Sequence, residues 1–174
     1  GSYRTVRDAI EDIQSIEPEK EVSDRYIELP LHPEAQGLEK ELRGNFLYNH
    51  ITTATRETAL SRFKALKAGE NFHDLSPELK TTYSNAERTQ NTIYMRLKYD
   101  EPSGTVVNVR KSMWIHPELD RAISIREAAR LQTFPDSFVF EGTKDSQYQQ
   151  VGNAVPPFLA KAVAKSIIDI LNRL

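Results

Sequence analysis

A polar turn near the C-terminus, Gly152-Asn153-Ala154-Val155, has residue types suited to holding a small ligand. Gly152 allows a tight turn that aims polar groups at a bound molecule. The pair Pro156-Pro157 that follows predicts the start of a helix, and a helix N-terminus favours anionic groups. A loop that only begins a helix would have the same sequence. From these residues alone, a ligand contact and a purely structural turn are both open.

The sequence contains no cysteine, which excludes a thiolate nucleophile, disulfides and thiolate metal ligands within its 174 residues. His50, His73 and His116 are not spaced like metal ligands, so no metal site is predicted. The lack of cysteine and of a secretory signal favours a cytoplasmic protein. No membrane contact is expected, because no stretch approaches the roughly 20 apolar residues of a membrane span. The opening Gly1-Ser2 is interpreted as the remnant of a cleaved tag.

Charge divides the chain into an acidic first part and a basic remainder, although the formal net charge is only −2. Residues 1–41 contain 5 Lys and Arg against 11 Asp and Glu, a balance of −6. Residues 42–174 contain 18 against 14, a balance of +4. Positive charge in the second part is compatible with binding a phosphate backbone. Chance segregation of solvated charges explains the same counts, and composition does not separate the two.

Apolar residues at three- and four-residue spacing predict amphipathic helices over residues 5–13 and 53–69. Ser124 and Glu127 form the capping-box pattern that starts a helix, which must end near Pro135.

A final helix is predicted from Pro156-Pro157 to the end of the chain. Because its apolar face needs a cover, we expect the isolated chain to form a homodimer through this helix. The residues of the apolar stripe are Leu159, Val163, Ile167, Ile170, Leu171 and Leu174.

Two strands are predicted over residues 92–100 and 105–115, joined by the turn 101–104 into a hairpin. The first strand alternates apolar and polar side chains, as expected for a strand with one buried face. Trp114 in the second strand is interpreted as a packing residue.

Residues 116–140 (HPELDRAISIREAARLQTFPDSFVF) and 147–167 (QYQQVGNAVPPFLAKAVAKSI) resemble the ninth and tenth sequence motifs of the DNA cytosine-5 methyltransferase family. In that family, an Arg-x-x-[Ser/Thr]-x-Arg-Glu-x-x-x-Leu-Gln-x-Phe-Pro-Asp run precedes Gly-Asn-[Ala/Ser]-Val-Pro-Pro. Residues 5–10 (TVRDAI) resemble the segment that follows the eighth motif. Because the agreement extends over many positions in order and at the right spacing, the resemblance covers essentially the whole chain.

The resemblance implies an α+β fragment: a small DNA-recognition domain of irregular strands joined to the C-terminal helical piece of an α/β, Rossmann-like methyltransferase fold. Residues 3–19 would end a catalytic-domain segment, residues 20–115 would form the target-recognition domain, and residues 116–174 would return to the methyltransferase domain. The expected activity of the parent enzyme is methyl transfer from S-adenosylmethionine to C5 of a flipped cytosine in double-stranded DNA. A bacterial restriction-modification or orphan system is the expected setting.

The resemblance also implies residue roles. Asn153 and Val155 match positions that contact S-adenosylmethionine, and Phe134 matches an aromatic position that lines the cofactor pocket. Thr105 belongs to a Thr-hydrophobic pair whose hydroxyl contacts the DNA backbone, and Arg121 is a candidate phosphate contact. Further cations predicted as DNA contacts are Arg110, Lys111, Arg56, Arg62, Lys64 and Lys67.

Four other residues of the two motifs are expected to be structural. Arg126 and Glu127 are predicted to join a buried polar network that supports the recognition domain. Gln150 is predicted to bond backbone groups around the turn that Gly152 makes possible.

Several family motifs have no counterpart in this sequence, which is expected to begin just after the eighth motif. The missing ones are the Gly-rich cofactor loop, the Pro-Cys dipeptide, the Glu-Asn-Val motif and the Gln-x-Arg-x-Arg motif. The N-terminal catalytic half is therefore an expected partner, either in the same parent chain or as the other subunit of a split enzyme. A stand-alone DNA-binding module and a degenerate interaction protein are the alternatives. An intact turn at 152–155 favours an enzyme part over the DNA-binding module, which needs no cofactor loop. Cofactor-dependent association with the N-terminal half would separate a split enzyme from the interaction protein.

Overall fold

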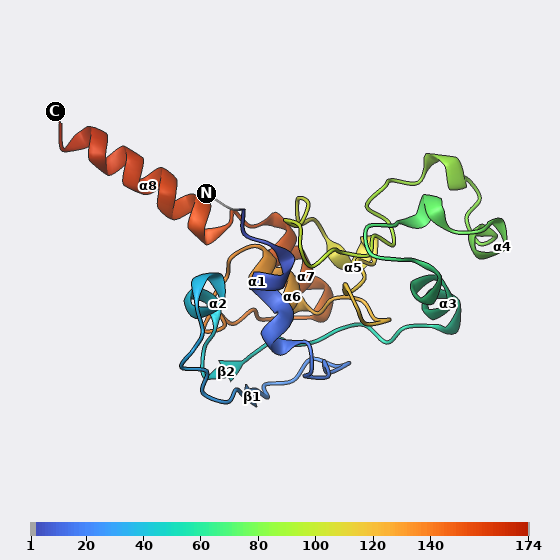
Figure 1. The fold of residues 1–174 in the computed structure, drawn as a ribbon, viewed down its shortest axis with the longest axis horizontal. Helices are drawn as coiled ribbons and strands as arrows, with labels where there is room; N and C mark the ends of the chain where they lie inside the picture. The colour runs from blue at the N-terminus through green and yellow to red at the C-terminus, as the bar shows by residue number, and fades with distance from the viewer. Residues whose placement is uncertain (1–2, 174) are drawn as a thin grey trace.

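The structure, a computed structural model, describes residues 3–173, which fold mainly into short helices with a small sheet (Figure 1). Gly1-Ser2, assigned to a tag, and Leu174 lie outside this range. The sheet pairs β1 (Ile27–Glu28) with β2 (Phe46–Leu47) in antiparallel register. The α-helices are α1 (Val6–Ile10), α2 (Gly37–Leu42), α3 (Glu57–Ala65), α4 (Pro77–Lys80), α5 (Val109–Ser112), α6 (Ile125–Leu131), α7 (Lys144–Asn153) and α8 (Pro157–Leu171). Single 3-10 turns are η1 (Glu11–Ile13), η2 (Phe72–Asp74) and η3 (Ala86–Arg88).

Helix α6 forms the centre of the larger hydrophobic core. The predicted capping box is confirmed: Ser124 Oγ accepts from the Glu127 N–H at 3.0 Å, and Glu127 Oε2 accepts from the Ser124 N–H at 2.7 Å. Every residue from Ile125 to Arg130 is buried, and the helix ends four residues before Pro135 as predicted. Helix α1 packs against α6, which confirms the helix predicted at the N-terminus.

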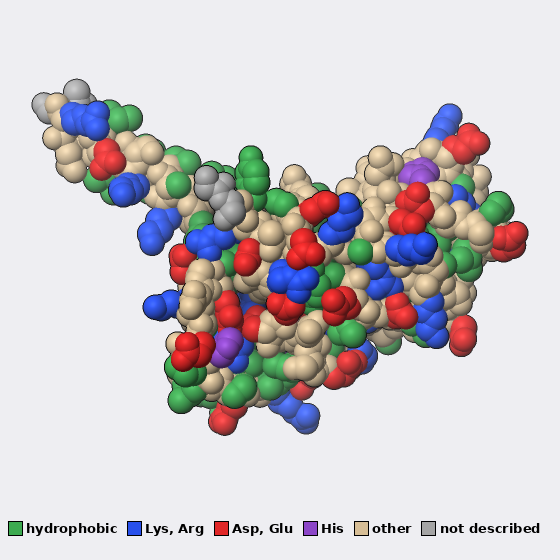
Figure 2. All heavy atoms as spheres, in the orientation of Figure 1, with side chains coloured by type: hydrophobic (Ala, Val, Ile, Leu, Met, Phe, Trp, Pro, Cys, Tyr) green, Lys and Arg blue, Asp and Glu red, His purple; other side chains and the backbone are tan. Residues whose placement is uncertain are grey.

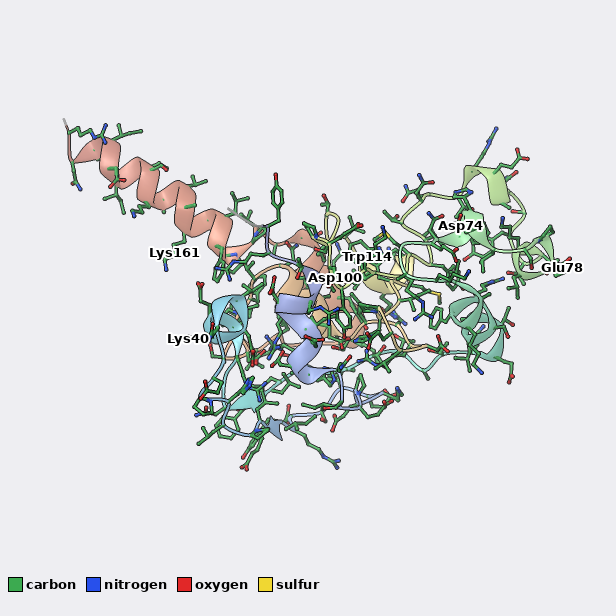
Figure 3. All side chains as sticks on the ribbon, in the orientation of Figure 1. Lys40, Asp74, Glu78, Asp100, Trp114 and Lys161 are labelled. Atoms are coloured by element: carbon green, nitrogen blue, oxygen red, sulfur yellow. The ribbon has the colours of Figure 1, made fainter. Side chains whose placement is uncertain are left out.

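The apolar residues gather in two main clusters that do not follow the predicted boundaries at residues 20 and 115. The larger cluster takes residues from 6–51, 97–114 and 123–151. The smaller cluster lies in a separate lobe and combines α3 and η2 with Tyr94 and Ile115 (Figure 1, right). Trp114 is fully buried in the larger cluster, within the body of the molecule (Figure 3), so its interpretation as a packing residue is confirmed.

The hairpin predicted over residues 92–115 is wrong. Its two halves are joined by a parallel bridge between Arg96 and Ile115 and by a bond from the Tyr94 N–H to the Ser112 carbonyl at 2.8 Å, and neither belongs to an antiparallel ladder. Tyr94 takes a left-handed conformation (φ 52°), which interrupts the alternation of the first half. In the second half, the side chain of Asn108 accepts from the Lys111 N–H, and this cap starts helix α5 where a strand was expected.

Helix α7 was not predicted, because its polar sequence KDSQYQQVGN lacks an apolar stripe of helical period. Thr143 caps it by accepting from the Ser146 N–H at 3.2 Å. Three side chains of α7 are buried, and two of them are polar: Gln147 and Tyr148. Hydrogen bonds from these groups to the chain replace the apolar contacts that usually reveal a buried helix.

Helix α8 starts at Pro157 as predicted and then extends away from the body of the molecule (Figure 1). No residue of α8 is buried. The apolar side chains along it are uncovered in Figure 2, with Leu159 to Leu171 of the stripe 52–62% exposed. Lys161 likewise extends from the helix into open space (Figure 3). The helix therefore does not fold back onto the rest of the chain.

Candidate functional site

The charged residues of α6 tie together segments that are far apart in the sequence. Arg126 is fully buried and donates to the carbonyls of Tyr48, Pro135 and Phe138 at 2.8, 2.9 and 2.6 Å. These bonds join the segment before α3 to the segment after α6. Arg126 thus fixes the backbone of these two segments by hydrogen bonds made inside the molecule.

Arg121 is directed into the same interior. Its Nη1 and Nη2 donate to the two carboxylate oxygens of Glu127 at 2.8 and 2.7 Å, and the residue is only 8% exposed. The charge of Arg121 is compensated inside the molecule by the Glu127 carboxylate. The structure therefore places this side chain in the interior and not on a surface open to phosphate, where the predicted DNA contact would need it.

The pKa of Glu127 reflects this pairing. Burial alone would raise it, but the hydrogen bonds and the charge of Arg121 outweigh burial and hold the pKa at about 2. Glu127 is therefore ionised at neutral pH although it is fully buried.

A second ion pair, between Arg130 and Asp136, completes the network on α6. Arg130 donates to both carboxylate oxygens of Asp136, at 2.9 and 2.6 Å, and to the Ala9 carbonyl at 3.1 Å. It also bonds the carboxylate of Asp12. Asp136 in turn accepts from the Gly44 N–H at 3.1 Å, so this pair links α1, the chain after α2 and the end of α6.

His116 makes the stability of this network sensitive to acid. Burial lowers the pKa of His116 to about 4, despite the opposing charge of Glu127. The geometry agrees, because His116 Nδ1 accepts from the backbone N–H groups of Glu118 and Leu119 at 3.2 and 3.1 Å. A proton on Nδ1 would remove both bonds.

We expect the folded chain to lose about 3 kcal/mol of stability between roughly pH 6.5 and pH 4 through His116. Its folded pKa lies below the unfolded value, so the contribution is complete above the unfolded pKa and is lost as pH falls toward the folded pKa. Urea denaturation across this range measures the effect, and His116→Asn should flatten the pH dependence. An equally steep dependence in that variant would contradict the assignment to His116.

Two residues that follow α6, Gln132 and Thr133, form hydrogen bonds with the backbone on either side of the turn at 153–155. Gln132 Nε2 donates to the Val151 carbonyl at 3.0 Å. Thr133 has a left-handed backbone (φ 63°), and its Oγ1 accepts from the Phe158 N–H at 3.1 Å, which satisfies the first turn of α8. The turn is therefore fixed before any ligand arrives.

The two residues predicted to contact the cofactor lie on the outside of this turn. Asn153 is exposed at the last position of α7, and Val155 is 64% exposed. Phe134, the third predicted contact, lies instead in the core at 8% exposure. It packs on Phe138 and Phe140, with ring centroids 4.9 and 5.2 Å away.

Gly152 does not make the tight turn that we predicted, because it lies in the last turn of α7. Its role here is close approach: a Cβ at this position would lie 2.8 Å from the Val107 carbonyl carbon and 2.9 Å from the Asn108 nitrogen. Only glycine allows the helix to touch this backbone. Gln150, on the same helix, donates to the Glu141 carbonyl at 2.9 Å, just before α7.

A groove of about 590 Å³ lies between α3 and α5. Arg56, Arg110 and Lys111 line it, and the buried Arg62 also belongs to its lining. In the described part of the chain, no carboxylate belongs to this lining. Such a lining attracts anions. The other residues that line the groove are Thr53, Ala54, Thr55, Thr58, Ala59, Phe63, Thr82, Tyr94, Val109, Met113, Ala122 and Tyr148.

The groove brings together only some of the predicted DNA contacts. Arg110 and Lys111 line it, whereas Thr105 is exposed and does not belong to its lining. Arg62 is 4% exposed and its guanidinium is bonded to the Leu79 carbonyl, Tyr94 and Thr82, so the prediction of Arg62 as a surface contact is corrected. The threonines of the groove were not predicted as contacts, although the run TTATRET (residues 52–58), which leads into α3, concentrates hydroxyl groups around Arg56.

Helix α7 borders both the groove and the exposed turn. Its Tyr148 lines the groove, and its Asp145 forms an ion pair with Arg110. Its last residue is Asn153. Across residues 3–173, no helix is long and apolar enough to cross a membrane, and no three acidic or histidine side chains are grouped to bind a metal ion.

Residues 4–169 match the family described as C-5 cytosine-specific DNA methylase. The chain is 34% identical over 183 residues to the type II methyltransferase M.DdeI of Desulfomicrobium norvegicum, an alignment that covers 95% of this chain and 43% of M.DdeI. It is 37% identical over 142 residues to the type II methyltransferase M.AquIB of Picosynechococcus sp., covering 75% of this chain and 94% of M.AquIB.

A crystal structure from E. coli, described as a candidate DNA modification methyltransferase encoded within a prophage, has a similar fold. The TM-score is 0.74 at 25% sequence identity, over 98% of this chain and 48% of that one. The chain thus spans less than half the length of M.DdeI and of the E. coli protein, but nearly all of M.AquIB.

Proposed function

This chain belongs to the C-5 cytosine-specific DNA methylase family, and we propose that it supplies the DNA-recognition part and one wall of the cofactor site of a DNA cytosine-5 methyltransferase. The parent enzyme would transfer a methyl group from S-adenosylmethionine to C5 of cytosine in double-stranded DNA. The observation that carries the proposal is helix α7, which contributes Tyr148 to the lining of a cationic groove, pairs Asp145 with Arg110 of that lining, and ends at an exposed turn.

The turn fits a polar cofactor by its chemistry. Asn153 carries an amide with hydrogen-bond donors on an exposed surface, and Val155 beside it is 64% exposed. S-adenosylmethionine, once bound, supplies the methyl group. The residues of this chain would only bind and orient it, with Gln132 and Thr133 keeping the turn in place.

The groove fits the phosphate backbone of DNA. Arg56 and Lys111 line it and belong to none of the ion pairs found within residues 3–173, whereas Arg110 is paired with Asp145. A phosphate entering the groove would compete with Asp145 for Arg110. Thr105 and the remaining exposed cations stay candidate contacts outside the groove.

The nucleophile must come from another part of the enzyme, because this sequence has no cysteine. In our proposal, a catalytic part with the thiolate and most of the cofactor pocket packs against this chain, in the same polypeptide or as a separate subunit. M.AquIB, of which this chain covers 94%, is compatible with the second arrangement, and M.DdeI, of which it covers 43%, is compatible with the first. Docking of the catalytic part would also cover α8.

The test is reconstitution. Incubated with labelled S-adenosylmethionine and a cytosine-rich duplex, the chain alone should give background counts, because loss of a nucleophile costs many orders of magnitude in rate. Adding the cysteine-bearing catalytic part of the enzyme should restore incorporation. Turnover by the purified chain alone, or persistent silence of the combined parts, would contradict the proposal.

A further inference from the structure

We propose that Gln149 is a positioning residue that couples the cationic groove to the cofactor turn. The inference rests on the proposed function and adds to it a route between the two sites. The route follows one face of α7, where Asp145, Gln149 and Gly152 lie at helical spacing. Asp145 and Gln149 contribute side chains to it, and Gly152 contributes a close backbone contact.

Gln149 bonds in both directions at once. Its Oε1 accepts from Asn108 Nδ2 at 3.0 Å, and its Nε2 donates to Asn153 Oδ1 at 2.7 Å. The two bonds require opposite ends of the amide, so they specify a single orientation of the Gln149 side chain. The second bond also orients Asn153: its amide oxygen accepts from Gln149, so the N–H donors of the same amide are left for another acceptor.

Asn108 connects this pair of bonds to the groove. Its own side-chain oxygen caps α5 by accepting from the Lys111 N–H at 3.3 Å. Helix α5 carries Arg110 and Lys111 into the groove, and Arg110 is paired with Asp145 one turn before Gln149. A phosphate that draws either cation away therefore acts on the helix that Asn108 caps.

Gly152 allows α7 to pack directly against the backbone of residues 107–108. Because a Cβ there would lie 2.8 Å from the Val107 carbonyl carbon, α7 already touches the backbone next to Asn108. We therefore expect a small displacement of the Val107–Asn108 backbone to displace the C-terminal end of α7 as well. The side-chain bonds of Gln149 are exposed and individually weak, so they can break and re-form as the groove fills.

The consequence is reciprocal coupling: DNA in the groove should change the affinity for the cofactor, and the cofactor should change the affinity for DNA by the same factor. Couplings of this kind are typically about 5–150-fold. Gln149→Ala should reduce the DNA-dependent change in cofactor affinity about fivefold, the factor associated with one hydrogen bond. Gln149→Glu should reduce it similarly, since a carboxylate still accepts from Asn108 but cannot donate to Asn153.

The experiment is calorimetric titration of the assembled enzyme with S-adenosylhomocysteine, with and without unmethylated plasmid duplex. This ligand has no methyl group to transfer, so only binding is measured. Asn108→Ala, Gln149→Ala and the double variant form a cycle, in which we expect the second change to add little to the first. The matched control is Gln150→Ala, an adjacent amide that bonds Glu141 and Ser146 and should leave the ratio of affinities within about twofold.

Each outcome decides one claim. The measured quantity is the ratio of ligand affinities with and without DNA. The role of Gln149 would be overturned if both Gln149 variants kept the ratio of the unmodified enzyme, or if Gln150→Ala lowered this ratio as much as they do. An unmodified enzyme that binds the ligand with no dependence on DNA would overturn the coupling and leave the proposed function intact. An enzyme that binds no ligand under either condition would overturn the proposed function itself.

Discussion

Replacing Arg130 with methionine is expected to destabilise the chain by about 3–5 kcal/mol, the typical cost of removing one partner from a buried ion pair. Methionine keeps most of the side-chain volume but leaves the carboxylates of Asp136 and Asp12 without this cation. Because folded domains are stable by only about 5–15 kcal/mol, such a loss is a large fraction of the total. Guanidinium denaturation monitored at Trp114, which is fully buried, would measure it.

The matched control for this substitution is Arg4→Met. Arg4 pairs with Glu41 at 3.2 Å, but both side chains are about half exposed, so the loss should stay below about 1 kcal/mol. Adding Asp136→Leu to Arg130→Met should recover part of the loss, since no carboxylate then remains unpaired at that position. Similar midpoints for Arg130→Met and Arg4→Met would show that the network on α6 does not hold the fold together.

The second large effect concerns α8. We expect the isolated chain to form a concentration-dependent dimer through this helix, because its apolar stripe is more than half exposed and covered by no described part of the chain. Burial of one such side chain stabilises by roughly 1.5–3 kcal/mol, so covering several is worth on the order of 10 kcal/mol. Sedimentation over a range of concentrations would detect the dimer.

Two aspartates in the stripe should convert the dimer to a monomer: Ile167→Asp with Leu171→Asp. The matched control changes charge by the same amount on the same helix, Lys161→Gln with Lys165→Gln, and should leave the dimer in place. A monomer at high concentration, with α8 protected from hydrogen exchange, would show that the stripe is covered within one chain and would contradict the expectation.

The sequence predicted the helices whose ends carry local signals. The capping box at Ser124 and the proline at 157 are local, and the helices there begin where those residues place them. The hairpin failed because local alternation of apolar residues says nothing about the partner of a strand. In the structure, a cap by Asn108 competes successfully with strand formation over the same residues.

Site residues could be predicted where they form a contiguous motif. They could not be predicted where their contacts join residues that are far apart in the sequence. The turn with Asn153 and Val155 was predicted just ahead of the last helix, and the structure has it there. The cofactor contact predicted for these two residues stays a prediction. Arg121 could not be assigned, because its pairing with Glu127 depends on how the chain turns before α6. The contacts of α7 were invisible for the same reason: they join residues around 108 to residues around 149.

The network on α6 has a consequence for how this chain reaches its fold. The bond from Arg130 to the Ala9 carbonyl joins residues 121 positions apart, and the bond from Asn49 to Gln147 joins residues 98 apart. Folds dominated by such distant pairs form slowly, because loop closure must precede the contact that stabilises it. At about 5–20 residues per second, a ribosome needs roughly 6–25 s to synthesise the stretch between α1 and α6. Helix α1 can pack on α2 soon after both are made, but its contact with α6 must wait for residues 125–131, so the larger core closes only after most of the chain has been synthesised.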